Sequence, residues 1–335
     1  MKSLVRSRLQ RLFFCGAVSL SFLAPLTVSL PASAQGLAVR TGYNKIWSTF
    51  PLHVAIVQKD FEKRGVDVKW VSFNTPNQIL QAMVAGELDL GVLTGPNLAV
   101  AHEQNIKVKG IALLTGPGDP PNTFFARKEL NVKSVRDLKG KTIGVNNYAG
   151  NFDLYLRRHL VDNGLDPKTD VRIVEIPIFQ IIPAITSRQI DAGVVDTIFT
   201  AAALKNNSKD LTPVFTYRDV GPFKNGWNGL VLAANESFVA KNRKAVVQFL
   251  RGYLDAVLLV QQNPQQGVKL YVDQTGNKNA LLLENGNDVP ANGKILMPEL
   301  QADIDLMKQF GYTKTTFKAD LVVDNSLIEE AARLK

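Results

Sequence analysis

The sequence predicts an α/β protein of two similar three-layer αβα lobes, with mixed, mainly parallel sheets joined by a two-segment hinge. Three observations support this fold class. One stretch of the chain resembles a second stretch further on, strand-like and helix-like patterns alternate in both, and turn-rich segments lie between them. Such alternation favours parallel sheets that are covered by helices on both faces.

The internal repeat is the clearest sign of two lobes. Residues 78–92 align with residues 180–194 at an offset of 102, and six of the fifteen aligned pairs are identical. At the same offset, Gly42-Tyr43-Asn44 aligns with Gly144-Val145-Asn146. This period is far longer than that of solenoid repeats. The repeat therefore predicts two related lobes, each of which opens with a strand.

The first lobe shows alternating strand and helix signals. Ser48 or Thr49 caps a helix that has Pro51 in its first turn and ends at Gly65. Residues 75–78, Thr-Pro-Asn-Gln, form a capping box with proline at the first helical position. The expected elements are a strand over 37–42, a helix over 49–64, a strand over 66–70, a helix over 76–85, a strand over 88–93 and a helix opened by residues 94–97.

The second lobe repeats this order, and a helical tail follows it. Its expected elements are a strand over 141–145, a helix over 151–163, a strand over 171–176, a helix over 178–188 and a strand over 192–195. Helices are expected in the tail over 244–262, 264–275, 298–310 and 326–334, with an Asn- and Gly-rich surface loop over 276–296. The tail lacks the repeat, so it is assigned to the first lobe.

Two turn-rich segments mark where the chain passes between the lobes. They are residues 115–121, which are rich in Gly and Pro, and residues 221–226. The predicted organisation is a signal peptide over residues 1–34, a first lobe over 35–118 and 224–335, and a second lobe over 119–223.

The first residues indicate export. Four basic residues precede an apolar run over residues 12–30, and Ala32-Ser33-Ala34 supplies small residues at a cleavage site after Ala34. The alternative is an uncleaved membrane span, since about 20 apolar residues suffice to cross a bilayer. Pro25 and several serines interrupt the run. We expect cleavage and a free periplasmic protein.

Removal of the signal changes the charge and the cysteine count. The whole chain has 39 basic and 30 acidic residues, and without the four basic residues of the signal the charge falls from +9 to +5. No basic stripe interleaved with aromatic residues is present, which argues against nucleic acid as a partner. Cys15 is the only cysteine and lies in the signal. The mature chain therefore has no disulfide, zinc-thiolate site or cysteine nucleophile.

Two motifs resemble a known family. Residues 137–141, Asp-Leu-Lys-Gly-Lys, resemble the strand entry of many type II periplasmic binding proteins, and residues 86–91 resemble their G-x-x-D-x-G signal. The order of elements is similar to that of the nitrate/sulfonate/taurine/bicarbonate-type binding proteins, which include thiamine-precursor receptors. The resemblance implies two lobes that close on a small ligand and then dock on a membrane permease.

The candidate ligand site follows from the predicted strands. Ligands of open α/β sheets bind at the carboxyl ends of the strands, and helix N-termini placed there favour an oxyanion. The hydroxyl groups at these ends are alternatively plain helix caps, and the tryptophans alternatively core residues. Phe73 is assigned to the core. The candidate ligand-binding residues are Asn44, Lys45, Trp47, Ser48, Thr49, Thr75, Thr94, Gly95, Asn147, Tyr148, Gly150, Asp196 and Trp227.

Asp196 complicates the choice of ligand. It replaces Thr94 in the repeat, and a carboxylate there repels an anion but suits an amine, an amidine or a ring N–H. It alternatively pairs with Lys45 or caps the next helix. The leading expectation is a sulfonate- or carboxylate-bearing organic ligand. The alternatives are a pyrimidine or thiamine precursor, or an amine-bearing ligand.

The expected function is that of the extracytoplasmic solute-binding component of an ABC importer, acting as a monomer with an inner-membrane permease and its ATPase. A ligand sensor for a membrane receptor is the alternative that the sequence does not separate from it. An enzyme of the same fold is disfavoured, because His53, His102 and His159 lie apart and no catalytic motif is present. No cofactor and no metal are expected.

Overall fold

The computed structural model describes residues 38–44, 46–116, 120–206, 209–224, 226–283 and 292–334. The predicted signal peptide, Cys15 and Lys45 lie outside these residues. Within them, none of the helices combines the length and apolar character that a membrane span requires.

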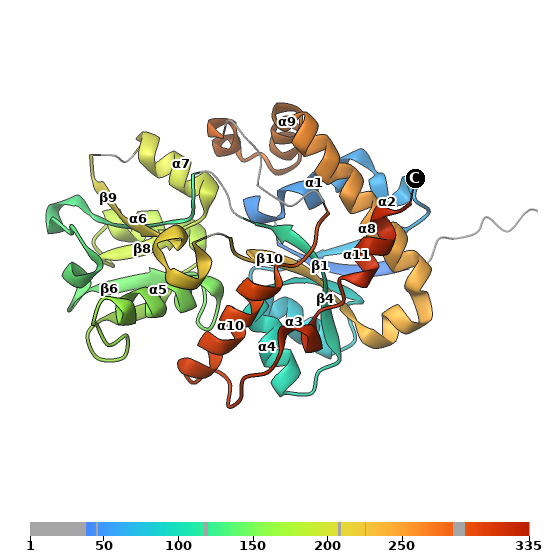
Figure 1. Cartoon of the computed structure of the whole chain (residues 1–335). Coiled ribbons are helices and arrows are strands. Elements are labelled where there is room, and N and C mark those ends of the chain that lie inside the picture. Colours follow the sequence, from blue (N-terminus) through green and yellow to red (C-terminus); the bar gives the residue numbers. More distant parts are fainter. Residues whose placement is uncertain are drawn as a thin grey trace, which may run out of the picture. The chain divides into compact units, whose positions relative to one another are not determined.

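The first sheet combines four strands from the first third of the chain with one from much later (Figure 1). Its order is β2-β1-β3-β10-β4, and β10 is antiparallel to both neighbours while the other four strands share one direction. The strands are β1 (Ala38–Tyr43), β2 (Asp67–Ser72), β3 (Leu90–Leu93), β4 (Val108–Thr115) and β10 (Leu230–Asn235).

The second sheet repeats this pattern with the order β7-β6-β8-β5-β9, in which β5 is the antiparallel strand. The strands are β5 (Thr123–Arg127), β6 (Thr142–Val145), β7 (Arg172–Glu175), β8 (Ala192–Val195) and β9 (Leu211–Thr216). The predicted α/β class with two similar, mixed sheets is confirmed. The predicted lobe limits at residues 118/119 and 223/224 stay predictions.

Four strands have no counterpart in the sequence prediction, namely β4, β5, β9 and β10. The inserted strands β5 and β10 pair with partners far away in the chain, so local patterns carry little information about them. They are also buried on both faces, which removes the polar and apolar alternation that reveals a half-exposed strand.

The two aspartates of the repeat hold the same place in each sheet. The backbone N–H of Arg40 donates to Asp89 Oδ2 at 2.9 Å, and that of Thr142 donates to Asp191 Oδ2 at 2.8 Å. Each pair is separated from its counterpart by the 102-residue offset. The aspartate of the G-x-x-D-x-G signal therefore ties the loop before the third strand to the start of the first.

The glycines of the same signal allow a helix to approach the sheet. A Cβ added to Gly91 would lie 2.6 Å from Cγ2 of Ile79, and one added to Gly193 would lie 2.6 Å from Cγ2 of Ile181. These pairs are also related by the offset of 102. Close helix–sheet packing thus explains why both copies of the motif carry glycine.

The helices cover the sheets, as Figure 1 shows. In the first sheet's group, α1 packs against α8 and α9, while α8 also packs against α2 and α11. The helices are α1 (Phe50–Gln58), α2 (Asp60–Lys63), α3 (Pro76–Val84), α4 (Gly95–Glu103), α5 (Asn151–Asp162), α6 (Ile181–Thr186), α7 (Thr197–Asn206), α8 (Glu236–Gln262), α9 (Pro264–Thr275), α10 (Met297–Gln309) and α11 (Ser326–Ala332).

Three predicted helices differ from the observed ones. The helix expected over 178–188 is a 3-10 helix, Ile178–Gln180, followed by the short α6. The helix expected over 49–64 is divided into α1 and α2, because Lys59 adopts a left-handed conformation with a φ of 56°. The helix expected from residue 244 begins earlier, at Glu236, and contains a kink at Asn242, whose φ and ψ are not helical. The expected loop over 276–296 contains a short 3-10 helix, Lys278–Leu282.

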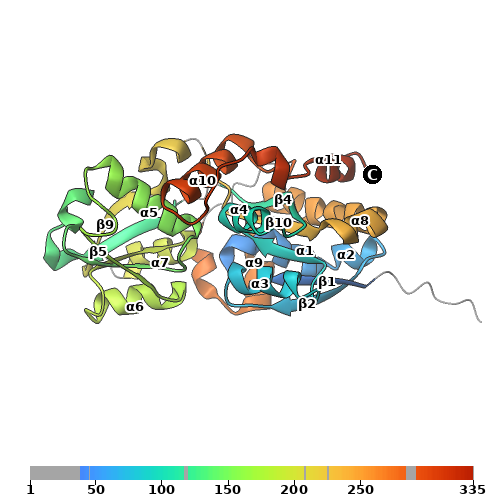
Figure 2. The same cartoon turned by 90° about the horizontal axis from the view of Figure 1, so that it is seen from below.

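Contacts between segments of the two groups lie around α5 and α10 (Figure 2), and also between α7 and the 3-10 helix Lys278–Leu282. Helix α10 contacts both α4 and α5. The Nδ2 of Asn151 donates to the carbonyl oxygens of Asn228 and Gly229 at 2.8 and 2.9 Å. The hydroxyl of Tyr312, just after α10, donates to Asp153 of α5. These contacts position the N-terminus of α5 at the candidate site.

Candidate functional site

A cavity of about 560 Å³ lies where strands of both sheets end. Asn44 follows β1 and Thr94 follows β3, while Asn146 follows β6 and Asp196 follows β8, and all four line the cavity. The carboxyl ends of parallel strands are where open α/β sheets bind ligands. The cavity therefore lies at the position that the strand-end rule indicates.

The structure brings seven of the thirteen candidate residues to the cavity lining. They are Asn44, Ser48, Thr75, Thr94, Asn147, Asp196 and Trp227. Five others are not part of the lining, and Lys45 lies outside the described residues. The five are Trp47, Thr49, Gly95, Tyr148 and Gly150.

Trp47 and Thr49 lie behind the lining. The Trp47 indole is 1% exposed, stacks on Phe50 at a centroid distance of 4.2 Å and meets Tyr271 edge-on. The short 3-10 helix Trp47–Thr49 turns this ring into the core instead of the cavity. The Thr49 hydroxyl lies 2.8 Å from the carbonyl oxygen of Asn44, so it supports the loop that carries that asparagine.

Tyr148, Gly150 and Gly95 have packing roles beside the cavity. The Tyr148 hydroxyl donates to the carbonyl of Ile173 at 3.0 Å, which holds the ring on the surface of the second sheet. A Cβ on Gly150 would lie 2.3 Å from Nδ2 of Asn147, so glycine leaves room for that cavity residue. A Cβ on Gly95 would similarly lie 2.5 Å from an oxygen of Asp303.

Two threonines of the lining are helix caps. Thr75 Oγ1 accepts from the backbone N–H of Gln78 at 3.4 Å, as the predicted cap requires. Thr94 Oγ1 accepts from the N–H of Asn97 at 3.3 Å and donates to its Oδ1 at 2.7 Å. Since the only hydroxyl proton of Thr94 is already used, this side chain has no further hydrogen-bond donor for a ligand.

Asp196 is a buried carboxyl group with one unused oxygen. The residue is 1% exposed, and its Oδ1 accepts from the backbone N–H of Phe199 at 3.4 Å. Its Oδ2 is buried and has no hydrogen-bond partner among the described residues. Burial raises the pKa of Asp196 to about 7. In its ionised form this carboxyl group suits a ligand that donates a hydrogen bond or carries positive charge.

Three asparagines of the lining add further acceptors. Asn44, Asn146 and Asn151 each have a buried Oδ1 with no hydrogen-bond partner among the described residues. The Nδ2 of Asn44 donates to the carbonyl of Phe73 at 2.9 Å, and the Nδ2 of Asn151 is likewise used by backbone carbonyls. Because these two amide nitrogens face carbonyl oxygens, Oδ1 is the atom left available in Asn44 and Asn151.

The charge of the lining is negative. Glu175 is its second carboxylate, and no lysine or arginine lines the cavity within the described part of the chain. The indole Nε1 of Trp227 is a buried donor without a partner in that part of the chain. Free acceptors thus outnumber this donor, which is the opposite of what a bare oxyanion requires.

Residues absent from the candidate set contribute much of the lining. Glu175 ends β7 and occupies the repeat position of Phe73, so the strand-end rule with the 102-residue offset identifies it. Asn146 follows from the same rule as the partner of Asn44. Phe179, in contrast, is 62% exposed at the cavity and has no sequence signal beyond its place in a strand–helix loop.

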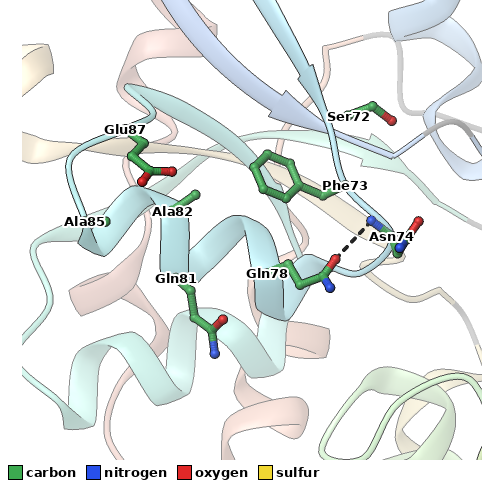
Figure 3. A pocket seen from close by; sticks show the side chains of 8 residues that line it. All are labelled: Ser72, Phe73, Asn74, Gln78, Gln81, Ala82, Ala85 and Glu87. Atoms are coloured by element: carbon green, nitrogen blue, oxygen red, sulfur yellow. Dashed lines mark hydrogen bonds between the residues drawn. The ribbon is translucent and has the colours of Figure 1, made fainter.

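A second, more open hollow of about 510 Å³ lies outside this cavity, between the end of β2 and α3. Figure 3 shows the Phe73 ring directed toward Ala82 of α3, while the N–H of Asn74 donates to Oε1 of Gln78 at 3.1 Å. Phe73 lines both hollows and packs against the core. It therefore forms part of the wall between them.

The described residues contain no group of three or more His, Cys, Asp or Glu side chains able to hold a metal ion. The three histidines lie on separate helices, α1, α4 and α5, and each packs against an aromatic ring. Burial lowers the pKa of His159. None of the three lines the main cavity.

The comparison with known families identifies the chain. The family model described as NMT1/THI5 like matches residues 48–267. The chain belongs to the NMT1/THI5-like family. A protein of Brucella abortus described as a binding protein is 30% identical over 265 residues, covering 78% of this chain and 77% of the relative.

Another relative of this NMT1/THI5-like protein is the formylaminopyrimidine-binding protein of Halalkalibacterium halodurans. It is 24% identical over 235 residues, which cover 70% of this chain and 68% of the relative. Among solved structures, the periplasmic aliphatic sulphonate binding protein SsuA of Escherichia coli is similar, with a TM-score of 0.70 and 19% identity, covering 87% of this chain and 99% of that one. The resemblance to periplasmic binding proteins in fold is thereby confirmed.

Proposed function

We propose that this NMT1/THI5-like protein is the extracytoplasmic substrate-binding component of an ABC importer. In this proposal the mature chain is a periplasmic monomer that captures a small organic ligand in the cavity and delivers it to a membrane permease. The family, the fold and the cavity at the strand ends of both sheets support the proposal. A ligand-sensing role would use the same cavity with a different membrane partner.

The ligand that the cavity favours offers N–H groups, as an amine, an amidine or an amino-substituted ring does. The observation that carries this choice is Asp196, a buried carboxyl group with an unused oxygen at the cavity. An N–H donor satisfies that oxygen, and a cation additionally gains from the nearby carboxylate of Glu175. The relative named for formylaminopyrimidine has a ligand of this donor-bearing kind.

A sulfonate- or carboxylate-bearing ligand is the second candidate. Helices α3 and α4 start beside the cavity-lining residues Thr75 and Thr94, and α5 starts within the lining at Asn151. Helix N-termini favour anions by about 0.3–1 kcal/mol each at exposed sites. The two carboxylates oppose this effect, so this ligand ranks below a donor-bearing one.

A thermal-shift screen separates the two ligand classes. The protein is exported, purified from the periplasm and mixed with benzylamine, benzamidine or 4-aminopyrimidine, or with methanesulfonate, benzoate or nitrate. A ligand present at 100 times its Kd stabilises the native state by about 2.7 kcal/mol and raises the Tm. We expect shifts with compounds of the first group. Shifts with the second group alone would contradict the ligand class, and turnover of a bound compound would contradict the binding role.

A further inference from the structure

We propose that Asn44 and Asn146 act as a pair that holds one donor group of the ligand, with one amide oxygen from each sheet. This inference rests on the proposed function and names the residues that select the ligand. The two asparagines line the same cavity, each with a buried Oδ1 that has no hydrogen-bond partner among the described residues.

The internal repeat gives the pair equivalent positions. Asn44 and Asn146 are separated by the offset of 102 and directly follow β1 and β6. These strands are structurally equivalent, because each pairs in parallel with the two strands of its sheet that follow it in the chain. The two oxygens therefore approach the cavity from corresponding strand ends of the two sheets.

The free oxygens are costly unless a ligand uses them. Asn44 is 1% exposed, and its Nδ2 is held by the carbonyl of Phe73, so the amide cannot turn to present its nitrogen without losing that bond. A buried acceptor without a partner is penalised relative to the same group in water. A donor group in the cavity removes this penalty for both asparagines.

One amino or ammonium group fits the pair best. Its nitrogen carries at least two N–H bonds, one for each oxygen, whereas a sulfonate or nitrate oxygen supplies none. Such a group connects the strand ends of the two sheets, so binding is tightest when both asparagines reach it. The pair then discriminates between a primary amine and the same compound with methylated nitrogen.

The test combines variants with matched compounds in calorimetric titrations of the purified protein. The probes are 4-aminopyrimidine and benzylamine, each compared with its N,N-dimethyl counterpart. We expect the wild type to bind each primary compound about tenfold or more tighter than its counterpart, because methylation removes a donor to a buried oxygen. Asn44→Ala and Asn146→Ala should each lose most of this discrimination, and the double variant should add little further loss, as sites that share one partner are non-additive.

Matched controls keep the outcome clear. Asn163→Ala changes an asparagine at the far end of α5, away from the cavity lining, and should retain the wild-type discrimination. The Tm of each unliganded variant reports whether Asn44→Ala, which also loses the bond to Phe73, still folds. Asn146→Ala removes an amide whose Oδ1 has no partner among the described residues and leaves the bond between Asn44 and Phe73 in place, so it tests the pair without that complication.

The outcomes for this proposal and for the proposed function differ. Two results would overturn the pair and leave the receptor role intact. In the first, both variants bind the primary compounds with unchanged discrimination. In the second, the double variant loses discrimination by the product of the losses in the two single variants. Absence of wild-type binding to every donor-bearing compound would overturn the pair and the proposed ligand class, whereas binding of methanesulfonate or benzoate by the same protein would still support the receptor role.

Discussion

The two sheets share their framework but differ where they meet the cavity. Asp89 and Asp191 accept the same backbone hydrogen bond at the same place in their sheets. At the cavity, however, Thr94 of the first sheet corresponds to Asp196 of the second. Thr94 satisfies its own hydroxyl through Asn97, whereas Asp196 leaves a buried oxygen unused.

This difference makes the two sides of the cavity chemically unlike. At one pair of equivalent positions the first sheet contributes an aromatic ring, Phe73, and the second contributes a carboxylate, Glu175, while Phe179 adds an aromatic ring from the second sheet's group. A ligand therefore meets different polar groups at equivalent positions of the two sheets. Among the described lining residues that the 102-residue offset relates, only Asn44 and Asn146 are identical, and in our proposal they form the anchor that both sheets share.

The largest expected effects concern the shared framework. Asp89→Ala or Asp191→Ala leaves the N–H of Arg40 or Thr142 without its carboxylate and breaks an ion pair, with Arg40 or with Arg127. We expect each change to lower the free energy of unfolding by about 3 kcal/mol, the lower end for a broken buried pair, because the arginines are partly exposed. Urea denaturation measures it.

Asp67→Ala is the control for these variants. Its ion pair with Lys69 is exposed on both sides, so its loss should cost about 0–1 kcal/mol. Equal effects at Asp67 and Asp89 would show that the repeated aspartates are surface charges instead of framework groups.

The sequence predicts the framework better than it predicts the site. Equivalent segments with the same offset reveal β1, β3, β6 and β8, and the capping box reveals the start of α3. The inserted strands β5 and β10 depend on pairing between distant segments, which no local pattern records.

At the site, prediction depends on side-chain direction. The strand-end rule finds the right loops, but it does not reveal that Trp47 turns into the core while Phe179 lies at the cavity. Both residues lie in loops between a strand and a helix. Each ring lies in a short 3-10 helix, and the Trp47 ring packs against Tyr271, which is more than 200 residues away in the chain.

The next prediction concerns the pH dependence of protein stability that the titration of Asp196 produces. A carboxyl group with a pKa of about 7 in the folded state, against about 3.9 unfolded, binds a proton on folding. Its contribution to stability is therefore greatest below the unfolded pKa and is lost as the pH rises toward 7. Tyr271 is its titratable neighbour, and burial together with the Asp196 charge raises the pKa of that phenol, so it stays neutral in this range.

Asp196→Asn should remove this contribution. Each pH unit is worth at most about 1.4 kcal/mol, and less as the pH approaches the folded pKa, so between pH 5.5 and 7 the wild type should lose about 1.6 kcal/mol that the variant keeps. Denaturant unfolding without ligand at several pH values measures the difference. Parallel pH profiles for the two proteins would mean that Asp196 is ionised without penalty. Thr94→Val, at the equivalent position, should leave the pH slope unchanged.

The smallest expected effect distinguishes the two repeated glycines. Gly91→Ala places a Cβ against Ile79 and against the sulfur of Met83, which is flexible. Gly193→Ala meets Ile181 and also the carbonyl oxygen of Gly144 at 3.1 Å, and a backbone atom in a sheet yields less easily than a methionine side chain. Since overpacking typically costs 1–3 kcal/mol, we expect the free energy of unfolding to fall by about 1 kcal/mol for Gly91→Ala and about 1.5 kcal/mol for Gly193→Ala, as measured by urea denaturation.

Gly221→Ala, with open space around the added Cβ, is the control. A larger loss at Gly91 than at Gly193 would reverse this order and show that the first sheet, not the second, has the tighter helix–sheet contact.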